Sequence, residues 1–287
     1  MALRAAAQRL FLVLATLLLG GLLAATLVRW SPGFGTDARE LDPRLGSQSL
    51  RALRQTSAAE QDILSFYLRY LGRMLTGDLG IARSLDRPVA ELLAKRAPLT
   101  AHSLLGGLAL GWLLGLALAL WLNLGERPMG EAAALASSGL LLCLPSGLLA
   151  LLALLAGAAP AIALAAVVFP RVLRYAGNLL KQAARREHVL AARARGISPA
   201  GILIRHVLPE AAPGLIALAG VTISLALGAA VPVEVVCDSP GIGQLAWSAA
   251  MARDLPLLVN LTMVITAATL VVNLAADLAV AALGARR

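Results

Sequence analysis

Residues 132–170 read AAALASSGLLLCLPSGLLALLALLAGAAPAIALAAVVFP and contain no charged side chain. An α-helix rises about 1.5 Å per residue, so a single helix of this length would be about twice as long as the roughly 30 Å hydrocarbon core of a membrane is thick. The stretch therefore predicts two spans. We place the break between them at Gly157–Pro160, where glycine and proline favour a turn.

Other long apolar segments occur at residues 10–28, 99–122, 211–233 and 255–283. Of all 287 residues, 59% are hydrophobic and only 14% are charged, whereas a soluble domain carries roughly 25% charged residues. The first segment is longer than the core of a secretory signal, which usually spans about 7–15 residues, so we expect it to remain as a span. The sequence thus predicts an all-α, polytopic membrane bundle of six transmembrane helices.

Three parts follow one another along the chain. We assign residues 1–28 to the first transmembrane span, 29–97 to an exterior loop with amphipathic helices, and 98–283 to a core of five spans with a polar loop at 171–209. From Ala58 to Met74 apolar side chains recur every three or four residues, which predicts an amphipathic helix in the exterior loop. Residues 88–95 have the composition of a second, short helix.

The distribution of positive charge predicts the orientation of the spans. A net charge of +9 would suggest nucleic-acid binding in a soluble protein, but here the basic residues lie between apolar segments, so we expect no nucleic-acid partner. The polar loop carries eight Arg and Lys residues against the single acid Glu187. Because short basic loops stay in the cytoplasm, we expect this loop and both chain termini to be cytoplasmic. The exterior loop is also rich in arginine, but loops longer than about 60 residues escape this rule.

Within the polar loop, EHVLAARARGISPAGILIRHVLP (residues 187–209) carries the local signals of a helix–turn–helix. Its first part consists of good helix formers, with an acid in the first turn and arginines in the last. Gly196 occupies the position of a left-handed C-terminal cap, Ser198 that of an N-cap, and Pro199 that of a first helical residue. We expect Pro209 to end the second helix before the next span. From these residues alone, the loop could dock into a partner protein or lie against anionic lipid head groups of the membrane.

Residues of this loop resemble the EAA loop of the permease subunits of binding-protein-dependent ABC importers. The matching residues are Glu187, Ala191, Ala192, Ala194, Gly196, Leu208 and Pro209. A second stretch, EVVCDSPGIG (residues 234–243), resembles the exterior loop that precedes the last span in this family. Three further stretches are similar to the dipeptide, oligopeptide and nickel branch: YLRYLGRMLTGDLG (67–80), RPVAELLAKRAPLT (87–100) and NLAAD (273–277).

The resemblance implies a type I ABC importer permease in the bacterial inner (cell) membrane, working as half of a pore with a second permease subunit. It implies a docking site for a cytoplasmic ATPase subunit, made of Glu187, Ala191, Ala192, Gly196, Leu208 and Pro209. It also implies an exterior loop or gate at Glu234, Pro240, Gly241 and Gly243. Nucleotide binding to the ATPases would switch the bundle between inward- and outward-facing states. A periplasmic or extracellular substrate-binding protein would deliver a peptide, or another small solute such as nickel.

The chain lacks the residues that ATP hydrolysis would need. A phosphate-binding loop requires G-x-x-x-x-G-K-[ST], but the two lysines, Lys95 and Lys181, follow Ala94 and Leu180. We therefore expect hydrolysis of ATP on separate partner subunits, and no catalytic residue or cofactor in this chain. We also expect no metal site, because His102, His188 and His206 are scattered and show no ligand-like spacing.

A helical membrane protein of another class, such as a secondary transporter, is the alternative. Secondary transporters place ionisable residues at mid-membrane, whereas the first three predicted spans have uncharged interiors. Glu234 and Asp238 flank the exterior end of the fifth span. We expect them to be solvated loop acids, with contact to a cationic substrate as the other reading.

Overall fold

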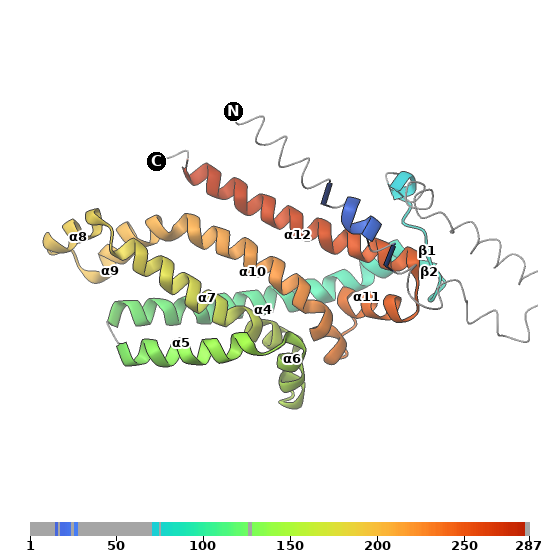
Figure 1. Ribbon diagram of the computed structural model, residues 1–287, viewed down its shortest axis with the longest axis horizontal. Coiled ribbons are helices and arrows are strands. Elements are labelled where there is room, and N and C mark those ends of the chain that lie inside the picture. Colours follow the sequence, from blue (N-terminus) through green and yellow to red (C-terminus); the bar gives the residue numbers. More distant parts are fainter. Residues whose placement is uncertain are drawn as a thin grey trace, which may run out of the picture. The chain divides into compact units, whose positions relative to one another are not determined.

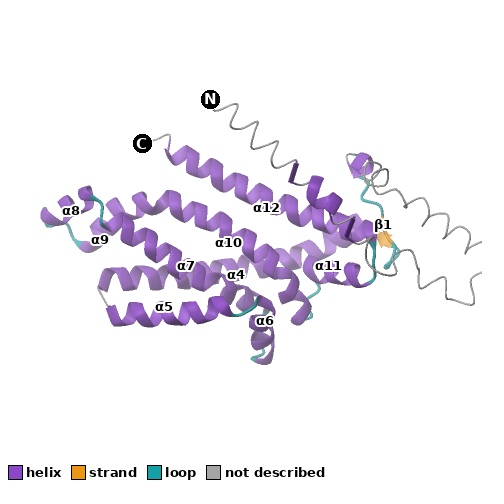
Figure 2. Cartoon of the chain, viewed as in Figure 1, coloured by secondary structure: helices purple, strands orange, loops and turns teal. Residues whose placement is uncertain are grey.

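The computed structural model describes residues 15–16, 18–23, 26–27, 71–74, 76–125 and 128–284. Most of these residues are helical, and a short antiparallel hairpin precedes the first long helix (Figure 2). Of the predicted first span, residues 15–16, 18–23 and 26–27 are described, and these are helical; of the predicted amphipathic helix Ala58–Met74, only residues 71–74 are described. The chain divides into two compact units, a smaller one of Met1–Lys95 with Leu245–Ala267 and a larger one of Arg96–Gln244 with Ala268–Arg287.

The larger unit contains most of the helices (Figure 1). In chain order the helices are α4 (Val89–Gly125), α5 (Pro128–Cys143), α6 (Ser146–Leu155), α7 (Pro160–Ala184), α8 (Glu187–Ala194), α9 (Pro199–Ile202), α10 (Leu208–Val236), α11 (Ile242–Met251) and α12 (Leu255–Gly284). A π-helical segment, Leu203–Val207, joins α9 to α10. Helices α4, α11 and α12 each contribute residues to both units.

In the described part of the chain, four helices are long and apolar enough to cross a membrane. They are Val89–Asn123, Pro160–Ala184, Pro199–Val236 and Leu255–Leu283. The pair Ala132–Cys143 and Ser146–Leu155 passes the same test together but is bent by 101°, which gives a fifth, broken span. The predicted second to sixth spans each fall on one of these segments, so the all-α membrane bundle is confirmed for this part of the chain.

The third span is broken at a point where no interruption was predicted. Helix α5 ends at Cys143 and α6 begins at Ser146, with Pro145 between them. Proline has no N–H and its ring collides with the preceding turn, so α5 stops before it. The turn after α6 matches the predicted break, because Gly157 has a φ of +67° and Pro160 is the first residue of α7.

Helix α4 is continuous, whereas a short helix at residues 88–95 and a separate span from residue 99 were predicted. It runs from Val89 to Gly125 and passes through Pro98. A proline inside a helix removes one backbone N–H, and a membrane helix tolerates this loss where its neighbours satisfy the freed groups. The predicted boundary at this proline was therefore wrong.

Helix α7 runs past Arg171, the predicted start of the polar loop, and ends at Ala184. From Pro160 to Arg171 a helix extends only about 17 Å, roughly half of a hydrocarbon core about 30 Å thick. The fourth span reaches full length only by including Arg171. Arg171 therefore lies about midway along a helix that is long and apolar enough to span a membrane.

Three glycines of α4 bring it close to α7. Gly107, Gly111 and Gly115 recur every four residues and so share one face of α4. The Cβ atoms that these glycines lack would lie 2.5, 3.0 and 2.9 Å from the Cβ atoms of Leu164, Val168 and Val172, in that order. Small residues at such contacts let membrane helices pack closely, and the three facing side chains belong to the buried core of the larger unit.

In the smaller unit, polar side chains tie the hairpin region to the start of α12. The hairpin consists of β1 (Ile81–Ala82) and β2 (Arg87–Pro88). Asp254, which is 2% exposed, accepts hydrogen bonds from the backbone N and the hydroxyl of Ser84, both at 2.8 Å. Buried Asn260 donates to the Leu79 carbonyl at 2.9 Å. These long-range bonds had no signal in the sequence, because their partners lie far apart along the chain.

Candidate functional site

The basic loop, which comprises residues 185–209, connects α7 to α10 and carries α8 and α9 at one end of these long helices (Figure 1). Gly196 follows α8 with a φ of +76°, the left-handed conformation predicted for it. Ser198 is the N-cap of α9, since its hydroxyl accepts a hydrogen bond from Gly201 N at 3.3 Å, and Pro199 is the first helical residue. The predicted helix–turn–helix and its caps are confirmed.

Pro209 does not end the second helix, contrary to the prediction. The apolar helix continues from Pro199 to Val236. The π-helical segment ends at Val207, directly before Leu208, and the Leu208 N–H bonds to the Leu203 carbonyl, five residues back. The wider turn shifts the hydrogen-bond register, so that Pro209 falls in the first turn of α10, where a missing N–H is tolerated.

One face of α8 packs against its own chain. Val189 and Ala192 are three residues apart on this face and expose 0% and 3% of their surface. The other buried members of this cluster are Ala119, Leu173, Leu180, Ala183, Ile202, Val207 and Ala211. Beside it, Arg186 Nε lies 3.5 Å from Glu210 Oε1. Ala192, one of the predicted docking residues, therefore fixes α8 to the long helices instead of presenting an outer surface.

The other predicted docking residues lie nearer the surface. Glu187, Ala191 and Gly196 are exposed, as is Pro209, whereas Leu208 is half-buried. Helical spacing explains this division. Glu187 and Ala191 are four residues apart and share the face of α8 opposite the buried one.

The exposed side of the basic loop also carries large apolar side chains that were not predicted as site residues. Leu190, Ile197 and Ile204 expose 52%, 36% and 64% of their surface. Helical spacing does predict the exposure of Leu190. It comes three residues after Glu187 and four before Ala194, so it lies on the same face of α8 as these two exposed residues. Together with the exposed arginines of the loop, these residues form a mixed apolar and basic surface of the kind that a partner protein covers.

The Glu234 turn, which comprises residues 234–244, joins α10 to α11. Glu234 exposes only 1% of its surface, and both oxygens of its carboxyl group accept hydrogen bonds. Oε1 accepts from the Thr100 hydroxyl at 2.6 Å, and Oε2 accepts from Gly243 N at 2.6 Å and Gln244 N at 3.2 Å. Thr100 Oγ1 accepts in turn from Ile242 N at 2.7 Å. Side chains of α10 and α4 thus satisfy the first three N–H groups of α11, which its own helix cannot.

The glycines of the Glu234 turn make room for this carboxyl group. A Cβ atom on Gly241 would collide with the carboxyl group of Glu234, and one on Gly243 would lie 2.7 Å from Val231 Cα. Glycine is therefore required at both positions because neighbouring atoms lie too close for a Cβ atom, and not because the backbone is left-handed. The structure brings Glu234, Gly241 and Gly243 together, while Pro240 is exposed beside them.

Glu234 is neither a solvated loop acid nor open to a cationic substrate, so both expectations for it were wrong. It is buried, and its oxygens are occupied by hydrogen bonds from its own chain. Asp238 does match the expectation: it is exposed and accepts a hydrogen bond from Gln244 Nε2 at 2.7 Å. The partner Thr100 and the helix α11 were both missed, because only the folded chain brings α4 and α10 together.

The chain resembles known proteins over nearly its whole length. The family described as binding-protein-dependent transport system inner membrane component matches residues 103–287. A Brucella ovis protein with the provisional name of peptide permease protein is 26% identical, over 99% of this chain and 98% of the relative. The glutathione transport system permease protein GsiC of Salmonella paratyphi A is 26% identical, over 96% of each chain. In fold, the chain resembles the inward-facing MetNI methionine ABC transporter, with a TM-score of 0.60 and 20% identity over 67% of this chain and 96% of the other.

Proposed function

Because this chain belongs to the family of binding-protein-dependent transport system inner membrane components, we propose that it forms half of the pore of an ATP-driven peptide importer. The chain is the multi-pass permease component of such a transporter. A second permease subunit completes the pore, cytoplasmic ATPase subunits use the ATP, and a substrate-binding protein supplies the solute. The chain itself catalyses no reaction and binds no cofactor.

The observation that carries this proposal is the construction of the basic loop. Its exposed side offers Glu187, Leu190 and Ala191 on one face of α8, a surface suited to a cleft in an ATPase subunit. The opposite face is fixed by Val189 and Ala192 to the cluster that includes residues of α7 and α10. A displacement of α8 by the ATPase would therefore move the long helices as rigid bodies, which is how such transporters switch state.

The charge distribution supports the orientation that we propose. The basic loop carries the arginines that mark cytoplasmic segments, so we place this loop and both termini in the cytoplasm. The Glu234 turn then lies at the opposite end of α10, on the exterior side, within reach of the substrate-binding protein. Its internal bracing by Glu234 would give that protein a rigid surface to dock on.

Peptides are the substrate class that we favour. The two relatives are named for a peptide and for glutathione, which is itself a small peptide. Nickel would need His, Cys or carboxylate ligands. In the described part of the chain, no group of three or more such residues is placed to hold a metal ion.

Glu187→Arg is expected to weaken binding of the ATPase subunit to the permease at least about tenfold, because it reverses a charge on the proposed docking face. Gly196→Pro is expected to act similarly, since proline cannot adopt the φ of +76° found there and the loop must change course. Co-purification of the ATPase with the permease from membranes measures both effects. Thermal unfolding of the permease alone should change little for Glu187→Arg, because this side chain is exposed. Gly196→Pro also removes the hydrogen bond from Gly196 N to the Arg193 carbonyl, so it should lower the unfolding temperature somewhat while the bundle still folds.

Two matched substitutions serve as controls. Glu91→Arg reverses the charge of another exposed acid, in the first turn of α4, and should leave ATPase binding unchanged. Gly196→Asn should also bind the ATPase, since asparagine tolerates the left-handed conformation. Undiminished co-purification with both Glu187→Arg and Gly196→Pro would refute the docking role of the basic loop.

A further inference from the structure

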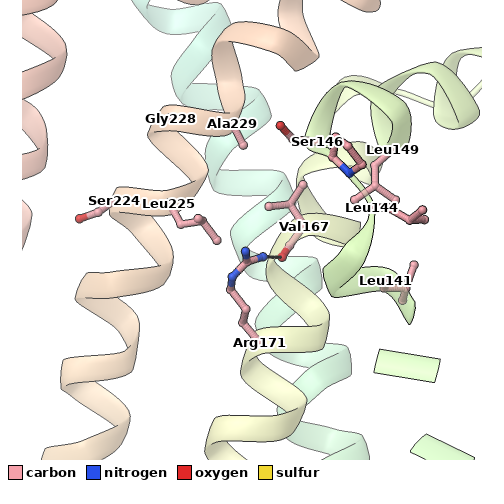
Figure 3. Close-up of a pocket in the computed structure, with 11 residues that line it drawn as sticks. Leu141, Leu144, Ser146, Leu149, Val167, Arg171, Ser224, Leu225, Gly228 and Ala229 are labelled. Atoms are coloured by element: carbon pink, nitrogen blue, oxygen red, sulfur yellow. Dashed lines mark hydrogen bonds between the residues drawn. The ribbon is translucent and has the colours of Figure 1, made fainter. Parts of the chain in front are cut away.

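A cavity of about 500 Å³ lies among α5, α6, α7 and α10 of the larger unit (Figure 3). It contains no residue of the basic loop or the Glu234 turn. Its walls are mostly leucine, valine, alanine and proline, and Arg171 of α7 is the one charged residue among those that line it. Both the volume and the pairing of apolar walls with a few polar groups are typical of small-molecule sites, which measure about 300–1,000 Å³.

Arg171 is placed to meet a ligand in this cavity. Its Nη1 donates to the Val167 carbonyl of its own helix at 2.9 Å, and Figure 3 shows the side chain reaching between α7 and α10. A guanidinium has five N–H donors, so most of them remain for other partners. Among the described residues, no acidic side chain forms an ion pair with Arg171.

An unpaired charge at this depth needs an explanation. Arg171 lies about 17 Å along α7, within the hydrocarbon thickness that the helix spans. A charged group among apolar side chains is costly unless it meets an opposite charge or water, and such residues in membrane helices mark substrate pathways. Arg171 thus indicates that an anion enters the cavity.

The other polar groups of the cavity favour an anion over a cation. Ser146 opens α6, and its N-cap is Pro145, which has no side-chain acceptor, so the positive end of this helix faces the cavity uncapped. The hydroxyl of Ser224 points away from Arg171 (Figure 3) and donates to Asn273 Oδ1 at 3.1 Å. The lining includes no His, Cys, Asp or Glu, so it offers nothing to a metal cation.

We propose that this cavity is a binding site on the translocation pathway, in which Arg171 binds the carboxylate of the transported solute. The inference rests on the proposed function and deepens it, because it names the chemical group that the permease recognises. A guanidinium and a carboxylate form charge-assisted, bidentate hydrogen bonds. The apolar walls would accommodate side chains of different peptides without selecting among them.

A cysteine introduced into the cavity can report its occupancy. Gly228 lines the cavity, and a Cβ atom added there meets nothing within 4 Å, so Gly228→Cys should fold normally. The background carries Cys143→Ala and Cys237→Ala, which remove both native thiols. The measurement is the rate of N-ethylmaleimide labelling of the full chain in phosphatidylcholine vesicles, with trialanine or its C-terminal amide as the probe.

Trialanine is expected to slow the labelling of the Gly228→Cys reporter, and trialanine amide to have no effect. Arg171→Gln should raise the trialanine concentration needed for protection by about tenfold or more, the effect of losing one charge-assisted contact. Arg171→Lys should retain part of the protection. Arg174→Gln removes an exposed arginine one turn further along α7 and should leave protection unchanged.

Three results with the peptide probes would overturn the inference, and a fourth with lipid alone would do so too. They are equal protection by the amide, protection that survives Arg171→Gln, and no protection by trialanine at its highest soluble concentration. Slower labelling caused by phosphatidylglycerol vesicles alone, and abolished by Arg171→Gln, would assign the site to lipid phosphate and equally refute it. The assay needs neither ATP nor partner subunits. Its failure is thus distinguishable from failure of the proposed function, which would appear as a loss of ATP-driven uptake.

Discussion

Replacing Glu234 by alanine is expected to destabilise the chain by about 3–5 kcal/mol and to abolish transport. The substitution leaves the N–H groups of Gly243 and Gln244 and the hydroxyl of Thr100 buried without their acceptor. Each buried donor left without an acceptor costs about 1–3 kcal/mol, so three of them account for a loss of this size. The midpoint of thermal unfolding of the purified permease measures the loss of stability, and peptide uptake by the assembled importer measures the loss of function.

Two further substitutions test whether the loss of stability comes from this hydrogen-bond network or only from the removal of a negative charge. Asp238→Asn removes an exposed acid four residues further on, in a conformation that asparagine tolerates, and should change stability by less than about 0.5 kcal/mol. Glu234→Gln keeps one acceptor oxygen, so its loss of stability should lie between those of Glu234→Ala and Asp238→Asn. If Glu234→Ala unfolded at the same temperature as Asp238→Asn, the bracing of α11 by this carboxyl group would be wrong.

Single glycine-to-alanine substitutions are expected to change stability in opposite directions, depending on what the added Cβ meets. Alanine at Gly107 would place its Cβ 2.5 Å from Leu164 Cβ, and α4 and α7 would have to separate, at a cost of about 1–3 kcal/mol. At Gly111 the corresponding distance to Val168 Cβ is 3.0 Å, so a smaller loss is expected. Gly106→Ala, 3.3 Å from Ala161 Cβ, should be the mildest of the three.

Gly228→Ala is the matched control for this series. Nothing lies within 4 Å of the added Cβ at this position, so only the better helix propensity of alanine remains, worth up to about 1 kcal/mol. Thermal unfolding of the four variants in one detergent should therefore rank Gly228→Ala highest and Gly107→Ala lowest. Equal unfolding temperatures for these two would show that α4 and α7 do not pack through the glycine face.

The membrane bundle could be predicted because its signals are local. The uncharged stretch of residues 132–170 is too long for one span, and Gly157 and Pro160 mark its turn. The caps of the basic loop, Gly196 and Ser198, could be predicted for the same reason, since each needs only its own neighbours.

The effect of each proline could not be predicted from its local sequence. Pro145 breaks a helix, whereas helices continue through Pro98, Pro170 and Pro209. Each proline removes the same N–H, so the outcome depends on what surrounds it. Pro145 is followed by a serine and a glycine, which favour a break, while a π-helical turn adjusts the register before Pro209.

The candidate sites, too, could be predicted only where the sequence signal is local. Glu187 and Ala191 were predicted and are exposed, but the burial of Ala192 and the exposure of Ile204 depend on how α8 and the π-helical segment pack. Glu234 was recognised, yet its role was misjudged, because its partner Thr100 lies 134 residues away. The cavity around Arg171 is built from four helices, which only the folded chain brings together.

Uptake of a labelled peptide into proteoliposomes tests the central claim most directly. The vesicles would contain this chain with its partner permease, its ATPase subunits and its substrate-binding protein. We expect uptake to require ATP and the ATPase subunits, to be lost with Glu187→Arg, and to be unaffected when the proton gradient is collapsed. Uptake driven by a proton gradient in vesicles that hold this chain alone, without ATP, would contradict its assignment to an ATP-driven importer.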